Sequence, residues 1–404
     1  MGCFSMVSVD EALKIILENV KELSEIEVFY RDAFGFVLAE DVVSEIDIPP
    51  FNKSAVDGYA VRSQDIKNGN TVLEVSECLS AGDFPRSGLL KGECVKIMTG
   101  APLPEDADAV VMVEDTEVLS DGRVRFLGDV LPGQNICRMG EDIARGETVL
   151  RKGNVLLAPE IAVLCALGRC RVRVVRKPSV AVLSTGSEIV EPDIPPERGK
   201  IRNSNGPMLM GLLKKEGYAA EYLGIAGDSE EELDERIATG IKNDVLIISG
   251  GVSAGDYDLV PPLLERAGAE IIFHRVRVKP GKPLLFARKG SCIIFGLPGN
   301  PVSNLTSFFY FVLPALKKMM GREDYRHGFI SAVLTSKIKQ KGDRASIMPS
   351  RFRIENGKYL AAPLELNGSG DIAGCCGCNC FIILEEGIRF MKEGESVSIL
   401  PLWV

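Results

Sequence analysis

Hydrophobic and polar residues follow three different patterns along the chain, and each pattern predicts a different kind of secondary structure. Near the start, Val9, Leu13, Ile16 and Val20 recur at three- and four-residue spacing, which is typical of an amphipathic helix. The sequence of residues 8–11, SVDE, predicts a capping box at the start of this helix. Because the helix has no obvious partner of its own, we expect it to pack on the α/β part of the chain.

The rest of the chain divides into β-rich and α/β stretches. Between residues 61 and 155, short apolar runs broken by glycines predict a mainly β domain. From Pro178 onward, apolar runs alternate with helical patterns, which is typical of βαβ units and a parallel sheet. After Gly321, short strands with turn residues return and predict a small β domain. The α/β strands are expected at 180–183, 222–225, 245–248, 271–278 and 292–295, and a long apolar helix is expected over 305–320.

The expected α/β strands lead into glycines and charged residues at Glu188, Gly250, Lys279 and Gly296. In doubly wound sheets such strand ends share one edge, and ligands bind at that edge. Residues 244–258, with the sequence DVLIISGGVSAGDYD, carry the densest set of these groups. We therefore expect the ligand site at this edge.

Within that stretch, glycines and carboxylates follow a buried strand directly. Gly250, Gly251 and Gly255 would allow backbone N–H groups to approach an oxyanion. Asp256 and Asp258 supply the oxygen ligands that Mg²⁺ prefers. A tight strand-to-helix turn followed by solvated carboxylates explains the same residues. Taken alone, the stretch leaves both interpretations open.

Other strand ends and loops add cations, hydroxyls and carboxylates. Lys279 and Lys282 lie on either side of a Pro-Gly pair, so one turn would present both ammonium groups to one anion. Asp57 lies in a polar loop, Thr99 follows a strand end and Asp142 lies at a turn. Thr99 and Asp142 could instead bond only to local backbone, and the loop that carries Asp57 could be an ordinary surface connection. The chain contains no GxxxxGK[ST] motif, so the P-loop interpretation fails.

Composition narrows the class of protein. The 404 residues are long enough for two to four domains, and no apolar run approaches the roughly 18 residues that span a bilayer. A net charge of −9 argues against broad nucleic-acid binding. Eleven cysteines without a disulfide-framework spacing fit a reducing compartment, so we expect a cytoplasmic protein. The only two histidines, His274 and His327, are expected to be structural, which makes a Ser-His-Asp triad improbable.

Seven motifs together resemble the MoeA family, the molybdopterin molybdenumtransferases, whose eukaryotic relatives include the C-terminal domain of gephyrin. In chain order the motifs are PPFNKSAVDGYAV, MTGAPLPEDADAVV, STGSE, IRNSN, SGGVSAGDYD, VKPGKPL and GLPGNPVSN, and the resemblance covers nearly the whole chain. It implies a four-domain homodimer whose active site lies between the α/β domain of one subunit and the DGY loop of the other.

The resemblance also implies a fold class, multidomain α/β plus β, and a division of the chain. A three-layer α/β molybdopterin-binding domain with a parallel-type sheet would comprise residues 1–26 and 177–326. A linking domain would comprise residues 27–45 and 147–176, and the β-rich domain with the DGY loop would comprise residues 46–146. The C-terminal β domain would comprise residues 327–404.

By the same resemblance, the protein would insert molybdate into adenylylated molybdopterin with Mg²⁺ and release AMP. The residues implied in catalysis are Asp57, Thr99, Glu188, Asp228, Lys279 and Lys282. Those implied in substrate binding are Asp142, Gly250, Gly251, Ser253, Gly255, Pro298 and Pro301. The metal ligands would be Glu188 with Asp256 or Asp258, which the sequence does not separate.

Three other functions fit the same motifs: a binding or scaffold protein that keeps the fold, a molybdopterin adenylyltransferase, and an insertase that prefers tungstate. A molybdopterin adenylyltransferase is also a candidate partner, whereas nucleic acid and membranes are not expected partners. The chain departs from the family after its Gly-Ser-Gly-Asp run, where Cys375, Cys376, Cys378 and Cys380 follow. Because positions in a strand alternate between faces, we expect these thiols to pack as small residues rather than to bind a metal.

Overall fold

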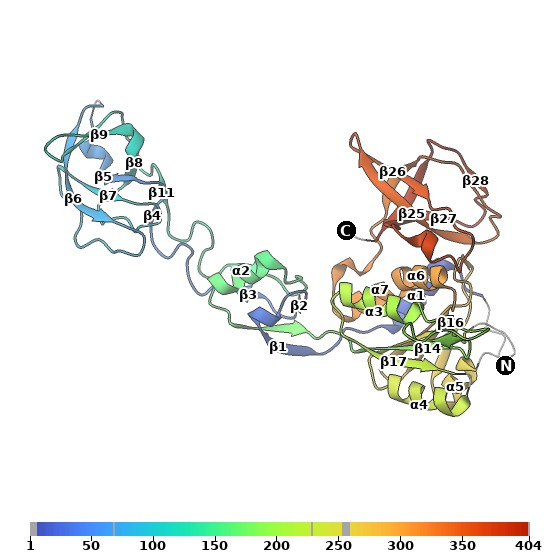
Figure 1. Ribbon diagram of the computed structural model, residues 1–404. Coiled ribbons are helices and arrows are strands. Elements are labelled where there is room, and N and C mark those ends of the chain that lie inside the picture. Colours follow the sequence, from blue (N-terminus) through green and yellow to red (C-terminus); the bar gives the residue numbers. More distant parts are fainter. Residues whose placement is uncertain (1–5, 68, 228, 253–258, 403–404) are drawn as a thin grey trace. The chain divides into compact units, whose positions relative to one another are not determined.

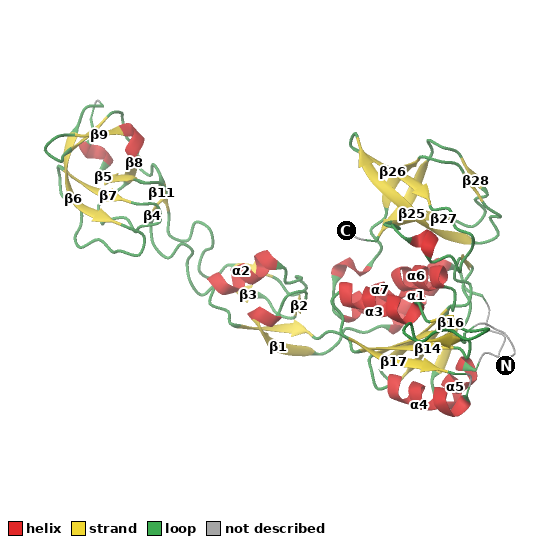
Figure 2. Ribbon diagram, viewed as in Figure 1, coloured by secondary structure: helices red, strands yellow, loops and turns green. Residues whose placement is uncertain are grey.

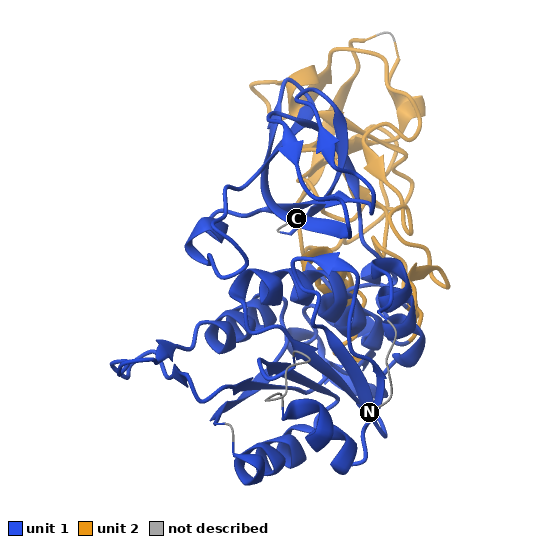
Figure 3. Ribbon diagram, turned by 90° about the vertical axis from the view of Figure 1, so that its right-hand side faces the viewer, with its two compact units in different colours: residues 1–39, 153–157, 173–404 blue, residues 40–152, 158–172 orange. Residues whose placement is uncertain are grey.

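The computed structural model describes residues 6–67, 69–227, 229–252 and 259–402, which form two compact units (Figure 3). Unit 1 contains residues 1–39, 153–157 and 173–404, and unit 2 contains residues 40–152 and 158–172. Each unit therefore combines segments that are distant in the sequence.

A six-stranded sheet forms the centre of the α/β part of unit 1. Its strand order is β17-β14-β18-β22-β21-β19. Strands β17, β14, β18 and β22 are parallel, whereas β21 is antiparallel to both β22 and β19, so the sheet is mixed. The strands are β14 (Val180–Thr185), β17 (Ala220–Ala226), β18 (Val245–Ser249), β19 (Glu270–Phe273), β21 (Leu285–Lys289) and β22 (Cys292–Leu297).

Helices cover both faces of this sheet, as Figure 1 shows. Val180 and Val182 of β14 belong to the hydrophobic cluster on the side of α1, α3, α6 and α7, whereas Ala181 and Leu183 belong to the cluster on the side of α4 and α5. This alternation makes the α/β part three layers thick. The helices are α1 (Val9–Asn19), α3 (Asn205–Lys215), α4 (Glu230–Gly240), α5 (Val260–Arg266), α6 (Pro301–Ser307) and α7 (Leu313–Met319).

Helix α1 begins as its sequence predicts and packs where it was expected to pack. The Ser8 hydroxyl accepts a hydrogen bond from the Glu11 N–H at 3.2 Å, and the Glu11 carboxylate accepts one from the Ser8 N–H. Ala12 and Ile16 are fully buried in the cluster that contains sheet residues such as Val245. The capping box and the packing of α1 on the α/β part are both confirmed.

The long apolar helix expected over 305–320 is continuous but not uniform. A π-helical segment, Phe308–Val312, separates α6 from α7. In an α-helix the Tyr310 carbonyl would accept a bond from the N–H of residue 314, which is a proline and has none. The His327 ring donates to this carbonyl instead, through Nε2 at 3.0 Å.

The C-terminal β domain of unit 1 is a closed six-stranded sheet that takes in one strand from outside the domain. Its order is β20-β25-β26-β23-β29-β27, and an additional pairing of β25 with β27 closes it. The strands are β20 (Val278–Lys279), β23 (Ile330–Leu334), β25 (Ala345–Glu355), β26 (Lys358–Pro363), β27 (Cys380–Leu384) and β29 (Ser396–Pro401), with a separate pair of β24 (Ile338–Lys339) and β28 (Phe390–Met391).

The single strand predicted over 271–278 is therefore wrong. It divides into β19, which lies in the α/β sheet, and β20, which pairs in parallel with β25 so that Lys279 lies opposite Ser346. The apolar pattern runs through both strands because both are half-buried, and periodicity alone cannot show that they belong to different sheets. Gly296, expected at a strand end, lies inside β22.

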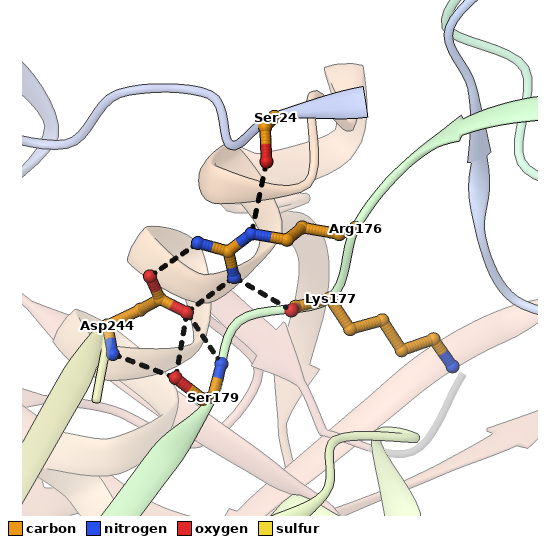
Figure 4. Close-up of polar contacts among 5 residues, drawn as sticks. All are labelled: Ser24, Arg176, Lys177, Ser179 and Asp244. Atoms are coloured by element: carbon orange, nitrogen blue, oxygen red, sulfur yellow. Dashed lines mark hydrogen bonds and ion pairs between the residues drawn. The ribbon is translucent and has the colours of Figure 1, made fainter. Parts of the chain in front are cut away.

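A buried ion pair anchors the strand β18 at its amino end (Figure 4). The Asp244 carboxylate accepts bonds from both terminal nitrogens of the Arg176 guanidinium at 2.6 and 2.7 Å, and from the N–H and hydroxyl of Ser179. Arg176 also donates to the Ser24 hydroxyl and to the Lys177 carbonyl. This network connects the segments around Ser24 and Arg176 to the start of β18, at the edge of the sheet opposite the carboxyl ends of its parallel strands.

A short sheet lies next to these segments in sequence, with β1 (Glu25–Phe29), β13 (Arg171–Val175) and β2 (Val37–Leu38).

Unit 2 is dominated by strands, as Figure 2 shows, and its main sheet has the order β8-β5-β7-β6-β10-β9. These strands are β5 (Gly58–Val61), β6 (Val72–Leu79), β7 (Glu93–Ile97), β8 (Ala109–Met112), β9 (Thr116–Val118) and β10 (Val124–Phe126). The unit also contains β3 (Val42–Val43) paired with β12 (Thr148–Leu150), β4 (Lys53–Ser54) paired with β11 (Ile136–Cys137), and α2 (Ala158–Ala166). The mainly β character predicted for this stretch is confirmed.

Helices in the described part of the chain are too short or too polar to cross a bilayer.

Candidate active site

The carboxyl ends of β14, β18 and β22 enclose a hollow of about 670 Å³, which we call the strand-end hollow. Most of the described residues that line it carry glycine backbone, hydroxyls or amides, and the charged residues among them are Glu188 and Arg202. Of the predicted site residues, it is lined by Glu188, Gly250, Gly251, Pro298 and Pro301. The sheet thus brings together residues that are more than 100 positions apart in the sequence.

Gly250 and Gly251 have a conformational reason to be glycine. Both have positive φ, at 96° and 63°. A Cβ on Gly250 would lie 2.5 Å from the Thr185 carbonyl oxygen, and one on Gly251 would lie 2.8 Å from the Thr185 hydroxyl. The turn after β18 can therefore lie against the end of β14 only without side chains at these two positions.

A buried amide network holds the loop after β22 in the wall of this hollow. Asn205 at the start of α3 donates to the Ser249 hydroxyl at 3.0 Å and to the Gly299 carbonyl at 2.7 Å. Asn304 in α6 donates to the same hydroxyl at 2.9 Å and to the Pro298 carbonyl at 3.2 Å. Three elements therefore fix the proline and glycine carbonyls of this loop.

A second hollow of about 520 Å³, the cationic cleft, adjoins the first, since Pro283 and Asn300 line both. Lys279 and Lys282 line it from the turn after β20, and Lys339 and Arg344 line it from the C-terminal β domain. Its described lining contains no carboxylate.

The loop of residues 368–371 closes part of the cationic cleft. Ser369 accepts a hydrogen bond from the Asn300 amide at 2.9 Å, and its carbonyl accepts one from the Val302 N–H at 3.1 Å. Asp371 shapes the loop by accepting bonds from the N–H groups of Asn367 and Gly374, and these bonds lower the pKa of its carboxyl. The Gly-Ser-Gly-Asp run therefore has a defined packing role beside the start of α6.

Asp57 and Thr99 are paired within unit 2. One carboxylate oxygen, Oδ1 of Asp57, accepts bonds from the Thr99 N–H at 2.8 Å and from the Thr99 hydroxyl at 2.7 Å. These two bonds hold the pKa of the exposed Asp57 carboxyl below its usual value. The next residue, Gly58, lies so close to Val111 that a Cβ would overlap its carbonyl oxygen. The DGY loop is thus fixed on both sides of Asp57.

Sequence models of one family match almost every part of the chain. The MoeA N-terminal region (domain I and II) matches residues 7–168, a probable molybdopterin binding domain matches residues 181–318, and the MoeA C-terminal region (domain IV) matches residues 331–402. A molybdopterin molybdenumtransferase of Staphylococcus epidermidis is 35% identical over 399 residues, covering 98% of this chain and 95% of its own. The chain belongs to the MoeA family. This membership makes it a transferase of molybdenum cofactor biosynthesis.

Other members of the MoeA family agree in sequence and in fold. Molybdopterin molybdenumtransferases of Staphylococcus aureus are also 35% identical, over 402 residues. The crystal structure of a molybdopterin biosynthesis MoeA protein from Pyrococcus horikoshii OT3 is 33% identical, with a TM-score of 0.83 over 98% of this chain and 100% of that chain. A molybdenum cofactor biosynthesis protein from Pyrococcus furiosus, at 21% identity and a TM-score of 0.60, shares the fold. The multidomain fold class predicted from the motifs is confirmed.

The structure of this MoeA-family chain places the remaining predicted site residues in three ways. Asp57, Thr99 and Asp142 lie in unit 2, where the Asp142 N–H donates to the Ile48 carbonyl. Lys279 lines the cationic cleft from a strand of the C-terminal sheet rather than from an end of the α/β sheet. Five predicted residues lie outside the described part of the chain: Asp228, Ser253, Gly255, Asp256 and Asp258.

The two histidines contact backbone rather than ligand hollows. His274 donates to the Val252 carbonyl at 2.8 Å, at the start of the loop that follows β18. Burial lowers the pKa of His327 to about 4, so the ring is neutral at pH 7 and donates to Tyr310. Both contacts fit the structural role expected for them.

Three of the four cysteines after the Gly-Ser-Gly-Asp run are divided between two hydrophobic clusters. Cys375 and Cys378 belong to the α/β cluster, and Cys380 belongs to that of the C-terminal domain. Burial raises the pKa of Cys375 to about 11 and that of Cys380 to about 12, which keeps both thiols protonated. Within residues 6–402, leaving aside the gaps at 68, 228 and 253–258, no three His, Cys, Asp or Glu residues form a metal-binding group. Cys375, Cys378 and Cys380 therefore pack as small residues, whereas Cys376 is exposed.

Sequence reasoning missed three residues that line these two hollows, Asn205, Lys339 and Arg344, and one that supports the wall of the strand-end hollow, Asn304. Asn205 lies within the quoted IRNSN motif and Asn304 within GLPGNPVSN, but neither was given a role. Lys339 and Arg344 lie in a C-terminal stretch that has no motif. Their position in the cleft depends on the pairing of β20 with β25, which no local pattern reveals.

Proposed function

We propose that this transferase inserts molybdate into adenylylated molybdopterin, with Mg²⁺, and releases AMP. The observation that carries the proposal is the contact between two chemically different hollows at Pro283 and Asn300. The strand-end hollow provides glycine backbone, amides and a carboxylate, and the cationic cleft provides positively charged side chains. A ligand with a phosphoanhydride in the strand-end hollow would lie beside an oxyanion in the cationic cleft.

The lysines of the cleft suit the oxyanion. Lys279 and Lys282 are exposed, and neither makes an ion pair with a described residue. In the proposed reaction water cleaves the phosphoanhydride into AMP, which leaves, and molybdopterin phosphate. One of the two phosphates keeps the bridging oxygen, and the other takes the oxygen of the water. Cations near the cleaved bond stabilise the negative charge that develops on the phosphate oxygens, and they hold molybdate while its metal enters the dithiolene.

The lining of the strand-end hollow fits Mg²⁺ in the chemistry of its donors, which are oxygens. In enzymes Mg²⁺ usually takes one or two carboxylates together with substrate phosphates and water. Glu188 would be such a carboxylate, with Asp256 or Asp258 as the second. Glu188 would hold the ion, which would supply neutralisation of phosphate charge.

The proposal includes a homodimer in which Asp57 and Thr99 of one subunit act with Glu188 and the lysines of the other. The Asp57–Thr99 pair supports it, because one carboxylate oxygen is fixed by Thr99 while the side chain stays exposed. A molybdopterin adenylyltransferase would supply the adenylylated substrate. Tungstate is an alternative metal oxyanion, because its size and charge are nearly those of molybdate.

AMP release tests the proposed reaction. Purified protein with adenylylated molybdopterin, molybdate and Mg²⁺ should release one AMP per cofactor formed, without ATP. Lys282→Ala and Glu188→Gln should each lower the rate at least a hundredfold, whereas the exposed Glu197→Gln should not change it. In a second assay with molybdopterin and ATP, ATP consumption that yields adenylylated molybdopterin and pyrophosphate would instead identify an adenylyltransferase. Absence of turnover in both assays would favour a scaffold.

Mixing experiments test the shared site. Asp57→Asn and Lys282→Ala should each be inactive as homodimers. If the two sites are shared, mixed dimers of these variants contain one intact site, and mixing should restore up to a quarter of the wild-type activity. No recovery after verified subunit exchange would mean that Asp57 and Lys282 of one site come from the same subunit.

A further inference from the structure

The cationic cleft gathers more positive charge than the turn after β20 supplies. Lys279, Lys282, Lys339 and Arg344 all line it, and no carboxylate does so among the residues that the structure describes. The three lysines have no ion pair or side-chain hydrogen bond with a described residue, whereas Arg344 lies 3.5 Å from its sequence neighbour Asp343 and donates to the Val278 carbonyl. Like charges that share a cleft repel one another, so an anion that binds there relieves the repulsion.

Lys339 belongs to the C-terminal β domain, and strand pairing positions its backbone beside this cleft. It lies in β24, opposite Phe390 of β28, and the Gln340 N–H that follows it donates to the Arg389 carbonyl at 2.9 Å. The Gln340 amide donates to the Ile388 carbonyl at 2.7 Å and accepts a bond from the Ser346 hydroxyl.

Ser346 connects Lys339 to the other side of the cleft. It is the register partner of Lys279 in the pairing of β20 with β25. One short path of strand contacts therefore runs from Lys339 through Gln340 and Ser346 to Lys279. The two lysines project from connected strands and reach the same hollow.

We propose that Lys339 is a further oxyanion-binding residue, so that the C-terminal β domain holds the same doubly charged tetrahedral anion as Lys279 and Lys282. The inference rests on the proposed function, because that function places an oxyanion in this cleft. Its ligand is either a free metal oxyanion or the phosphate group of the organic substrate, which share the same charge and shape. Lys339 is a binding residue and makes no bond in the reaction.

Titration calorimetry of the full-length protein with sodium tungstate and, separately, with inorganic phosphate tests this assignment without turnover. Lys339→Ala should weaken binding of the preferred anion about tenfold and reduce its dependence on salt concentration. Lys339→Arg, which keeps the charge, should bind within threefold of the wild type. Lys337→Ala is the matched control, because Lys337 is an exposed lysine two residues earlier that does not line the cleft, and it should bind like the wild type.

The outcomes separate the inference from the proposed function. Tenfold weaker binding by Lys339→Ala supports the inference, and preference for tungstate or for phosphate then identifies the free oxyanion or the substrate phosphate. Unchanged binding by Lys339→Ala, with binding abolished by Lys282→Ala, overturns the role of Lys339 and leaves the proposed function intact. Equal weakening by Lys337→Ala and Lys339→Ala reduces the effect to general surface charge and also overturns it. If the wild-type protein binds neither anion, both proposals fail.

Discussion

The buried imidazole of His327 should make the stability of unit 1 depend on pH in a predictable direction. Burial lowers its pKa from the ordinary 6.5 to about 4, and the nearby Lys317 charge acts in the same direction. The unfolded chain binds a proton at this ring near pH 6.5, whereas the folded protein does so only near pH 4. Stability from the neutral ring is therefore complete above pH 6.5 and is lost as the pH falls toward 4.

The size of the effect follows from the separation of the two pKa values. A difference of about 2.5 pKa units corresponds to about 3 kcal/mol in total, of which about 2 kcal/mol is already lost at pH 5. His327→Gln keeps an N–H donor for the Tyr310 carbonyl and does not titrate. Between pH 7.5 and pH 5, the wild-type protein should therefore lose about 2 kcal/mol of unfolding free energy more than this variant loses.

Two measurements check this prediction. Urea unfolding of the wild type and of His327→Gln at both pH values gives the change in unfolding free energy of each protein. The difference between these two changes reports His327, because the contributions of the other titrating groups cancel. Side-chain NMR gives the pKa directly, because the chain has only two histidines and His274→Asn removes the other signal. A His327 resonance that titrates near pH 6.5, or a stability difference that does not change with pH, would refute the reasoning.

Three further predictions concern packing, the buried ion pair and the DGY loop. Asp244→Asn should cost about 2 kcal/mol at pH 7, because it breaks a partly buried ion pair with Arg176. In urea unfolding the cost should shrink as the pH falls below 3.8, because the Asp244 carboxyl is then protonated in the unfolded chain and, at still lower pH, in the folded protein, where the bonds from Arg176 lower its pKa. Gly58→Ala should destabilise unit 2 by about 3 kcal/mol through overlap at Val111, measured as a shift in the melting temperature, while Gly128→Ala, with nothing near its Cβ, should not. Thr99→Val removes one of two bonds to Asp57, so NMR titration should show the pKa of that carboxyl rising part of the way to 3.8.

Much of the fold could be predicted from the sequence because burial imposes a period on each element. Strands such as β14 and β18 are covered on both faces and appear as continuous apolar runs. Helix α1 carries its start signal in residues 8–11, and its apolar stripe follows from the face that it buries. The apolar runs and the helix start signal depend only on how each element is buried. They can therefore be recognised in the sequence without knowing which elements pack together.

Features that depend on distant neighbours could not be predicted in the same way. The run over 271–278 continues across two strands of different sheets. The π-helical segment depends on Pro314 together with a donor from His327, which lies 17 residues away from Tyr310. The glycines after β18 signalled a turn, but the reason that they must be glycine is the Thr185 carbonyl of another strand.

The placement of β20 changes how the Lys279–Lys282 turn should be understood. The turn begins in the C-terminal sheet, where Lys279 pairs with Ser346, and a few residues later the chain enters β21 of the α/β sheet at Leu285. Both ends of this short segment are therefore hydrogen-bonded to different sheets of unit 1. A shift of the C-terminal sheet would move the lysines relative to Glu188 and the glycine turn. Loosening of β25 should for this reason weaken oxyanion binding. Ser346→Ala, which removes the side-chain bond between Ser346 and Gln340 in the lining of the cleft, tests the part of this coupling that the bond carries. Unchanged tungstate affinity in that variant would mean that the position of the lysines does not depend on this bond.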